Sequence, residues 1–285
     1  MKKSDFGVLI LTHGRPEKVI TYEMLRKQGY SGRIVLVVDD GDASLPEYQD
    51  RYGDEVSVFS KEEVAGTFDI GDNFGGTNVV VFARNVCHEI AKGLGLTHFL
   101  VLDDDYTQMI FRFNERYEWT TADVRARNLD RVFKAFARFL DSTTAITVTM
   151  AQGGDFIGGA DGSFGSIITL RRKAMNSFFC RTDRPFQFPG RINEDANAYA
   201  VLAAIGKLLF THNFIALSQV QTQKSEGGLT EFYLEKGTYV KSFYTVMMHP
   251  SGARVRLMQV DNPRLHHSIA WNNTTPMILR ETVKK

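Results

Sequence analysis

Three consecutive aspartates, Asp103–Asp105, directly follow the apolar run Phe99–Leu102. An uninterrupted apolar run of this length is typical of a strand that is buried on both faces of a parallel sheet. Three neighbouring carboxylates repel one another, and a divalent cation such as Mg²⁺ or Mn²⁺ would relieve that repulsion, because such ions prefer oxygen ligands. An acidic turn after a strand explains the same residues, so the triplet alone leaves both interpretations open.

Two earlier apolar runs, Gly7–Leu11 and Ile34–Val38, have the same character. Residues 17–28, after the first run, and residues 79–93, before Phe99–Leu102, have helical composition. This alternation of strands and helices predicts an α/β fold in which a mostly parallel central sheet is flanked by helices.

Polar residues stand where the first two apolar runs end. Because ligands bind outside the carboxyl ends of parallel strands, we expect these residues and the aspartate triplet to converge on one edge of the sheet. Backbone amides and an arginine at a helix start can hold a phosphate, and an acid at a strand end can accept hydrogen bonds from ribose hydroxyls. A simple turn explains either loop as well. The candidates are Thr12, His13, Gly14 and Arg15 in the first loop and Asp39 and Asp40 in the second.

Composition disfavours several classes of protein. The 285 residues suffice for one large α/β domain or two small ones, and no apolar stretch reaches the roughly 18 residues that would predict a membrane span. The first residues turn acidic too soon for a secretory signal, and two cysteines form no disulfide framework, so we expect a cytoplasmic protein. No Gly-x-Gly-x-x-Gly follows the first run and no Gly-Lys-Ser/Thr loop occurs, which disfavours a dehydrogenase and a P-loop NTPase.

Two further polar segments are candidates for chemistry. Arg84 and Asn85 lie on the predicted helix before the triplet, where the arginine can reach a phosphate or the acids. Asn193 stands as the cap of a predicted small-residue helix, and Glu194 and Asp195 follow it. The helix dipole favours one carboxylate at such a position but does not require two. The sharper interpretation is a general base that takes a proton from an acceptor hydroxyl.

Charge is distributed unevenly along the chain. Residues 1–170 carry 18 basic and 25 acidic side chains, whereas residues 171–285 carry 16 and 8, so the second part favours an anionic partner. We predict a helix over residues 122–141 with a basic stripe, which is either a solvated face or a face that contacts phosphates. The stripe consists of Arg127, Arg131, Lys134 and Arg138, and strands are predicted over residues 145–150, 166–170 and 208–223.

Four histidines follow the triplet in the chain, at positions 212, 249, 266 and 267. One of them could complete a metal shell together with the acids, and our choice is the pair His266 and His267, shortly before Trp271. A structural role accounts for any single histidine among them.

Taken in order, these segments resemble the GT-A class of nucleotide-sugar glycosyltransferases over roughly residues 6–215. The aspartate triplet is similar to the DxD motif of that class, and Glu194-Asp195 is similar to its xED motif. The other matching segments are Leu11–Pro16, Val37–Gly41 and Ala83–Asn85.

The GT-A resemblance implies a UDP-sugar donor and a divalent metal, Mn²⁺ or Mg²⁺, that stabilises the leaving nucleotide diphosphate. It implies one catalytic domain over residues 1–285, with a nucleotide-sugar-binding half over 1–110 and an acceptor-binding half over 111–285. The implied donor-binding residues are Thr12, His13, Gly14, Arg15, Arg84, Asn85, Asp103 and Asp104, with Asp39 or Asp40 on the nucleoside. The implied metal ligands are Asp105, Asp103, His266 and His267, and Asp195 beside Glu194 is the implied base of an inverting displacement.

A narrower resemblance links the chain to the TET-associated glycosyltransferases of bacteriophages. The similar segments are Phe99–Tyr106 with its third aspartate, the Gly-rich residues 152–165, the Lys224–Gly228 loop and the His-His…Trp tail. The resemblance implies transfer to 5-hydroxymethylcytosine, or hydroxymethyluracil, in phage DNA in the host cytoplasm.

A DNA acceptor makes two demands on this chain. Because the net charge is only +1, DNA would have to bind through local basic patches. The modified base would also have to leave the base stack, because an enzyme cannot reach it inside a duplex. A glycan or protein acceptor, a nucleotidyltransferase and a non-catalytic DNA-binding module remain alternatives. The sequence identifies neither the donor sugar nor the oligomeric state.

Overall fold

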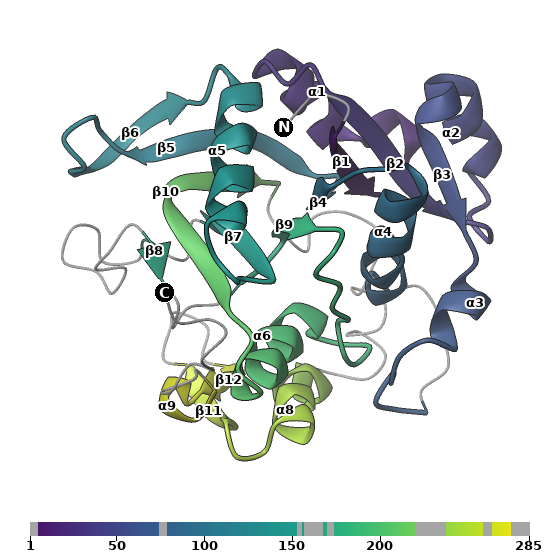
Figure 1. Cartoon of the computed structure of the whole chain (residues 1–285). Coiled ribbons are helices and arrows are strands. Elements are labelled where there is room, and N and C mark those ends of the chain that lie inside the picture. The colour runs from purple at the N-terminus through teal and green to yellow at the C-terminus, as the bar shows by residue number, and fades with distance from the viewer. Residues whose placement is uncertain are drawn as a thin grey trace.

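The computed structural model describes residues 5–73, 79–152, 156, 168–169, 174–220, 238–258 and 264–274. Its centre is a ten-stranded sheet with helices on both faces (Figure 1). The strands of this sheet are β1 (Phe6–Leu11), β2 (Arg33–Asp39), β3 (Val56–Phe59), β4 (His98–Asp103), β5 (Tyr106–Phe113), β6 (Trp119–Arg125), β7 (Thr147–Gln152), β8 (Ile168–Thr169), β9 (Ser177–Arg181) and β10 (Leu209–Gln219).

The sheet combines a parallel block with a mixed region. Its strands are ordered β3-β2-β1-β4-β9-β7-β10-β5-β6, and β8 pairs with β10. β3, β2, β1 and β4 are mutually parallel, β7 is parallel to β10, and β9 and β5 are antiparallel to both of their neighbours. The predicted α/β class with a central sheet flanked by helices is confirmed.

Successive residues of β1 belong to different cores, because side chains alternate across a strand. Val8 and Ile10 pack in one buried cluster with residues of α1 and α5, and Leu9 and Leu11 pack in another with residues of α4 and α6. The sheet is therefore buried on both faces, as its continuous apolar runs predict. The helices are α1 (Ile20–Lys27), α2 (Leu45–Tyr52), α3 (Lys61–Ala65), α4 (Val81–Gly93), α5 (Leu129–Asp141) and α6 (Glu194–Ala204), with short 3₁₀ turns η2 (Pro16–Lys18) and η3 (Gly53–Glu55).

The helix predicted over residues 122–141 is wrong in its first part. Residues up to Arg125 form β6, an edge strand paired with β5, and α5 begins only at Leu129. The side chain of Asn128 accepts a hydrogen bond from the Arg131 amide at 3.1 Å and so caps α5. The β-branched residues before this cap favour a strand, and the helical spacing of the basic stripe does not extend back through them.

The C-terminal residues add a smaller unit against α6. It contains α8 (Thr238–Met248), the hairpin of β11 (Ala253–Met258) and β12 (Arg264–Ile269), and α9 (Trp271–Thr274). The Trp271 ring stacks on Tyr199 of α6 at 5.4 Å. Apart from Gln152 and Phe156, the Gly-rich segment 152–165 lies outside the described residues, as does the Lys224–Gly228 loop. Within the described parts of the chain, no helix has the length and apolar character needed to cross a membrane.

Candidate functional site

The acids at the strand ends meet at one edge of the sheet, as expected. β1 lies between β2 and β4, and its last residue, Leu11, pairs with Val37 on one side and with Asp103 on the other. Asp39 ends β2 and Asp103 ends β4, so the two carboxylates flank the loop that follows β1. Asp39 is buried, whereas the neighbouring Asp40 is exposed.

Asp104, the middle aspartate of the triplet, is fully engaged by the loop after β1. Nε and Nη2 of Arg15 each donate a hydrogen bond of 2.7 Å to its carboxylate, and the Thr12 hydroxyl donates a third of 2.7 Å. The buried Tyr48 hydroxyl contacts the Thr12 hydroxyl at 2.7 Å and accepts the Arg15 amide at 3.0 Å. Asp104 therefore fixes the loop, and its oxygens are already taken by donors of this chain.

The second half of the same loop is held by acids that follow β2. Nδ1 of His13 lies 2.7 Å from Oδ2 of Asp39, and the Gly14 amide donates to Oδ2 of Asp42 at 2.7 Å. The Lys61 ammonium lies 2.9 Å from Oδ1 of Asp39. Burial alone would raise the pKa of Asp39, but the hydrogen bonds from His13 and Lys61 outweigh it and lower the pKa to about 2.

His13, Asp39 and Asp42 also form the one group of three metal-type side chains found among the described residues, with ligand atoms within 4.8 Å of one another. The Lys61 ammonium already neutralises Asp39 there, and a divalent ion beside it would be repelled. The hydrogen bond that the His13 ring donates to Asp39 raises the pKa of His13, which favours the protonated ring over the neutral ring that a metal requires. The charges around this group therefore disfavour a metal ion there.

Thr21, the second residue of α1, holds the turn that carries the other two aspartates. Its hydroxyl donates to the Asp103 carbonyl at 2.7 Å and accepts the Tyr106 amide at 2.9 Å, and its own amide donates to the Asp104 carbonyl at 3.0 Å. Thr21 is fully buried, and its three bonds stabilise the turn between β4 and β5.

Asp105 is the least compensated acid of the triplet. Among the described residues, no cationic side chain lies within ion-pair distance of its carboxylate. Burial, with added repulsion from Asp103 and Asp104, raises the pKa of Asp105 to about 6. Asp103 keeps only long contacts, with Nη2 of Arg84 at 3.3 Å and the Tyr106 hydroxyl at 3.4 Å. Asp103 and Asp105 thus retain oxygens that can bind a cation.

Arg84 links this edge of the sheet to the start of α6. Its guanidinium lies 3.3 Å from Asp103 and 3.3 Å from Oε1 of Glu194, and the side chain is 4% exposed. The aromatic rings of Phe178 and Phe188 lie 5.3 and 5.8 Å from the guanidinium carbon. Burial raises the pKa of Glu194 to about 7, and Arg84 offsets only part of that effect. Arg84 is therefore enclosed by protein groups and positions two carboxylates.

Asp195 follows Glu194 in the first turn of α6 and is partly exposed. Its Oδ1 accepts the Ala196 amide at 2.6 Å, and no cation among the described residues pairs with it. Asn193 occupies the cap position in the left-handed conformation, with φ of 53°, but its side chain makes no capping bond. Instead its side-chain amide donates to the Lys241 carbonyl at 2.6 Å. The predicted cap position is therefore confirmed, but the side chain bonds α8 and does not cap α6.

Three of the predicted site residues lie apart from the contacts at this edge of the sheet. The Asn85 amide bonds the backbone of Phe188 twice, at 2.7 and 3.1 Å, and so fixes the segment before α6. His266 and His267 lie on β12, with ring centroids 4.3 Å apart. Among the described residues, they form no three-residue metal group with Asp103 and Asp105, and their role as ligands stays a prediction.

Several residues that shape the site carry no signal in the sequence. Thr21, Tyr48 and Lys61 act through partners that are between 22 and 85 residues away, so no local pattern marks them. Asp42 stands in the polar turn after the second apolar run and could have been chosen beside Asp39 and Asp40.

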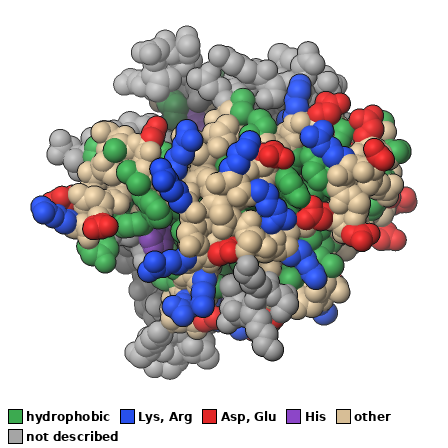
Figure 2. Space-filling model, turned by 90° about the horizontal axis from the view of Figure 1, so that it is seen from above, with side chains coloured by type: hydrophobic (Ala, Val, Ile, Leu, Met, Phe, Trp, Pro, Cys, Tyr) green, Lys and Arg blue, Asp and Glu red, His purple; other side chains and the backbone are tan. Residues whose placement is uncertain are grey.

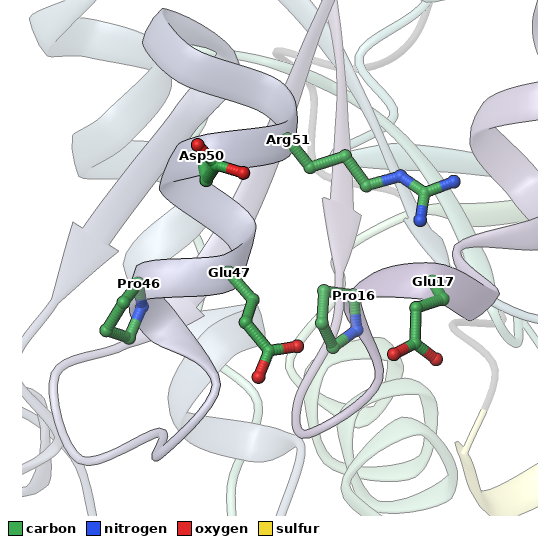
Figure 3. Close-up of a pocket in the computed structure, with 6 residues that line it drawn as sticks. All are labelled: Pro16, Glu17, Pro46, Glu47, Asp50 and Arg51. Carbon is green, nitrogen blue, oxygen red and sulfur yellow. The ribbon is translucent and has the colours of Figure 1, made fainter.

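A separate pocket of about 550 Å³ lies beside η2 and α2, close to the first loop (Figure 3). Three carboxylates and one guanidinium line it, together with two prolines. A nucleotide diphosphate would be repelled by this excess of acid, so the pocket is not the donor site. The lining residues are Pro16, Glu17, Pro46, Glu47, Asp50 and Arg51.

Comparison with known proteins gives one family match. The sequence model of the TET-associated glycosyltransferase family matches residues 6–228. A search of curated proteins found no match. Solved structures with a similar arrangement include three bacterial or archaeal proteins, each below 20% identity.

The first of these is the mannosyltransferase PcManGT of Pyrobaculum calidifontis, in complex with GDP-Man and Mn²⁺, with 13% identity and a TM-score of 0.46 over 77% of this chain. The second is glucosyl-3-phosphoglycerate synthase of Mycobacterium tuberculosis, in complex with Mn²⁺, UDP and phosphoglyceric acid, with 8% identity and a TM-score of 0.47 over 93% of this chain and 86% of its own. The third is TarS of S. aureus, residues 1–349, with 16% identity and a TM-score of 0.42 over 74% of this chain. The chain spans 58% of the mannosyltransferase and 60% of the TarS fragment.

Proposed function

Because this chain belongs to the TET-associated glycosyltransferase family, we propose that it transfers a sugar from a UDP-sugar to the hydroxymethyl group of 5-hydroxymethylcytosine in bacteriophage DNA. The reaction inverts the configuration at the anomeric carbon. It is catalysed by a single domain and takes place in the host cytoplasm. The observation that carries this proposal is the Arg84 bridge, which brings the acids that end β4 next to the acids that begin α6.

Asp103 and Asp105 are the proposed metal ligands. They fit a hard divalent ion because Asp105 has no cationic partner among the described residues and Asp103 has only long contacts, whereas Asp104 is saturated by Arg15 and Thr12. Mn²⁺ or Mg²⁺ held here would neutralise the diphosphate of the donor. His266 and His267 are the candidates for a further ligand.

The remaining residues of the edge bind and orient the donor. The buried Asp39, with His13 and Lys61 around it, presents a fixed set of hydrogen-bonding groups to the nucleoside. The loop Thr12–Arg15 is held rigid by its bonds to Asp104 and Asp42, so its exposed atoms are positioned before the donor arrives. Arg84 acts as a positioning residue, because protein groups enclose it.

The chemical step needs a base near the acceptor. We assign Asp195, whose carboxylate takes the proton of the hydroxymethyl group while that oxygen attacks the anomeric carbon of the sugar. The bond from this carbon to the phosphate oxygen breaks, and UDP leaves with the electron pair. Glu194 is held by Arg84 and supports the position of Asp195.

The proposal is tested by incubating the protein with Mn²⁺, a panel of UDP-sugars, and DNA with or without 5-hydroxymethylcytosine. Nucleoside mass spectrometry should detect an added hexose or pentose on the modified base only. Asp195→Asn should lower kcat about 10²–10⁴-fold with little change in UDP binding. The control is Asp54→Asn, an exposed aspartate of η3, which should keep full activity.

A different acceptor would be detected by the same panel. Transfer to a glycan or protein and to no modified DNA would contradict the proposed acceptor, and transfer to hydroxymethyluracil alone would correct the base. Incorporation of the nucleotide itself would indicate a nucleotidyltransferase.

A further inference from the structure

A groove of about 960 Å³ lies between α5 and the strands β5, β6 and β10. Its floor is aromatic, with Phe111 of β5, Phe214 of β10 and Phe139 of α5 among the lining residues. The rings of Phe111 and Phe214 meet edge to face at 5.5 Å, and all three side chains are partly exposed. The groove does not belong to the site described above, since none of the acids of that site lines it.

The rim of this groove is basic. Arg125, Arg127 and Arg131 line it and are exposed, and no carboxylate of a described residue pairs with any of them. The one acid in the lining, Asp123, already lies 3.4 Å from Arg112. Guanidinium groups without a carboxylate partner, close to aromatic side chains, fit an anionic ligand that also carries flat rings.

The surrounding surface is consistent with such a ligand. Figure 2 shows Lys and Arg side chains interleaved with hydrophobic side chains across one face of the molecule, while acidic side chains gather toward the right. β6 is the last strand of the sheet among those described, and most of its residues are exposed. An extended strand of nucleic acid can therefore reach the groove without displacing a described element.

The length of β5 gives the distance between the groove and the aspartate turn. β5 runs from Tyr106, next to Asp105, to Phe111 in the groove, which is five residues along a strand and so about 17 Å. Duplex DNA rises about 3.4 Å per nucleotide along its axis, and an extended single strand is longer per nucleotide. The groove therefore lies fewer than about five nucleotides from a base bound at the aspartate turn.

We propose that this groove binds a single-stranded segment of the acceptor DNA, fewer than about five nucleotides from the modified base. The inference rests on the proposed function for the identity of the acceptor. Phosphates contact Arg127 and Arg131, and bases stack on Phe111 and Phe214. Of the basic stripe, only Arg127, just before α5, and Arg131 of α5 line the groove and take part, which sets Arg131 apart from Lys134.

Binding is measured by fluorescence anisotropy with a labelled, unmodified single-stranded 20-mer and no donor. Arg131→Glu should weaken binding about tenfold and lower the salt slope by about 1, because one phosphate contact is lost. Phe214→Leu keeps an apolar side chain and should still weaken binding about fivefold, because a stacking ring is lost. The matched control is Lys134→Glu, which makes the same charge change on the same helix outside the groove lining.

Equal dissociation constants for Arg131→Glu and Lys134→Glu would overturn the proposal, as would equal binding by Phe214→Leu and the unaltered protein. Circular dichroism confirms that each variant is folded. These measurements need no catalysis. They therefore show whether the groove binds single-stranded DNA even if no transfer to modified DNA occurs and the proposed function fails.

Acceptor length gives a second readout when transfer does occur. A modified mononucleotide is too short to reach the groove, so Arg131→Glu should leave its KM unchanged. A modified 20-mer should show a KM raised about tenfold with kcat unchanged. The same effect on both acceptors would overturn the proposed spacing.

Discussion

Nη1 of Arg84 lies 3.3 Å from Oε1 of Glu194, and both side chains are almost completely buried. This contact joins α4 to α6, and through Asp103 it also joins both helices to the end of β4. Two acidic segments that are about 90 residues apart in the chain are thus held by one cation. Removal of that cation should affect stability and activity together.

We expect Arg84→Met to lower the free energy of unfolding by about 3–5 kcal/mol, because it leaves buried carboxylates without a counter-charge. Urea denaturation at pH 7 measures the change. Glu194→Gln should cost less, since burial already disfavours its charged form and raises the pKa of Glu194 to about 7. The double variant should be more stable than the sum of the two losses predicts, and strict additivity would show that the contact contributes nothing.

The Thr21 hydroxyl is predicted to fix the aspartate turn. Thr21→Val keeps the shape but leaves the Tyr106 amide and the Asp103 carbonyl without their partner. A loss of about 1–3 kcal/mol in the free energy of unfolding should follow, since a buried amide loses its acceptor. Thr21→Ser keeps the hydroxyl and serves as the control. A Val variant as stable as the Ser variant would rule out this role.

Asp39 should make stability depend on pH in the acid range. Its pKa is lowered from 3.8 to about 2, since the hydrogen bonds from His13 and Lys61 outweigh burial. A depressed folded-state pKa contributes stability above pH 3.8 that is lost as the pH falls toward 2, here about 2 kcal/mol in full. Asp39→Asn should therefore be less stable than the unaltered protein by about 2 kcal/mol at pH 6 and by about half that at pH 3. Urea denaturation at both values checks this, and a difference independent of pH would contradict it.

The parallel part of the fold was predictable because its strands are buried on both faces and therefore apolar throughout. The apolar runs predict β1, β2 and β4, and the positions where these runs end predict the acids at the ends of β2 and β4. The antiparallel strands were harder, because β6 is an exposed edge strand whose polar sequence also fits a helix. Its assignment depends on pairing with β5, which is a tertiary contact.

The candidate site was predictable to the same extent. Carboxylates at strand ends follow from the strand pattern, but the division of roles within the triplet does not. Asp104 differs from Asp105 because Arg15 and Thr12 reach only the former, across about 90 residues of chain. The support from Thr21 and Lys61 likewise depends on how the helices lie against the sheet.

That division predicts opposite behaviour for two neighbouring aspartates. Without metal, Asp105→Asn should stabilise the protein at pH 7, because the raised pKa of Asp105, about 6, means that its charged form is unfavourable in the fold. The gain should be about 1–2 kcal/mol after allowance for solvent screening. Burial also raises the pKa of Asp104, but Arg15 and Thr12 oppose that effect. Asp104→Asn should destabilise the protein, because the three bonds from Arg15 and Thr12 lose a charged acceptor.

Mn²⁺ should reverse the order of stability, so that the unaltered protein becomes more stable than Asp105→Asn. An ion that binds only the folded state adds about 2.7 kcal/mol at a hundred times its Kd, and Asp105→Asn should lose most of this gain. Thermal denaturation in EDTA and in Mn²⁺ measures both states, with Asp104→Asn as the variant that keeps its response to the ion. If Mn²⁺ stabilised the Asp105 variant as much as the unaltered protein, the metal would have to bind elsewhere, and the group of His13, Asp39 and Asp42 would be the next candidate.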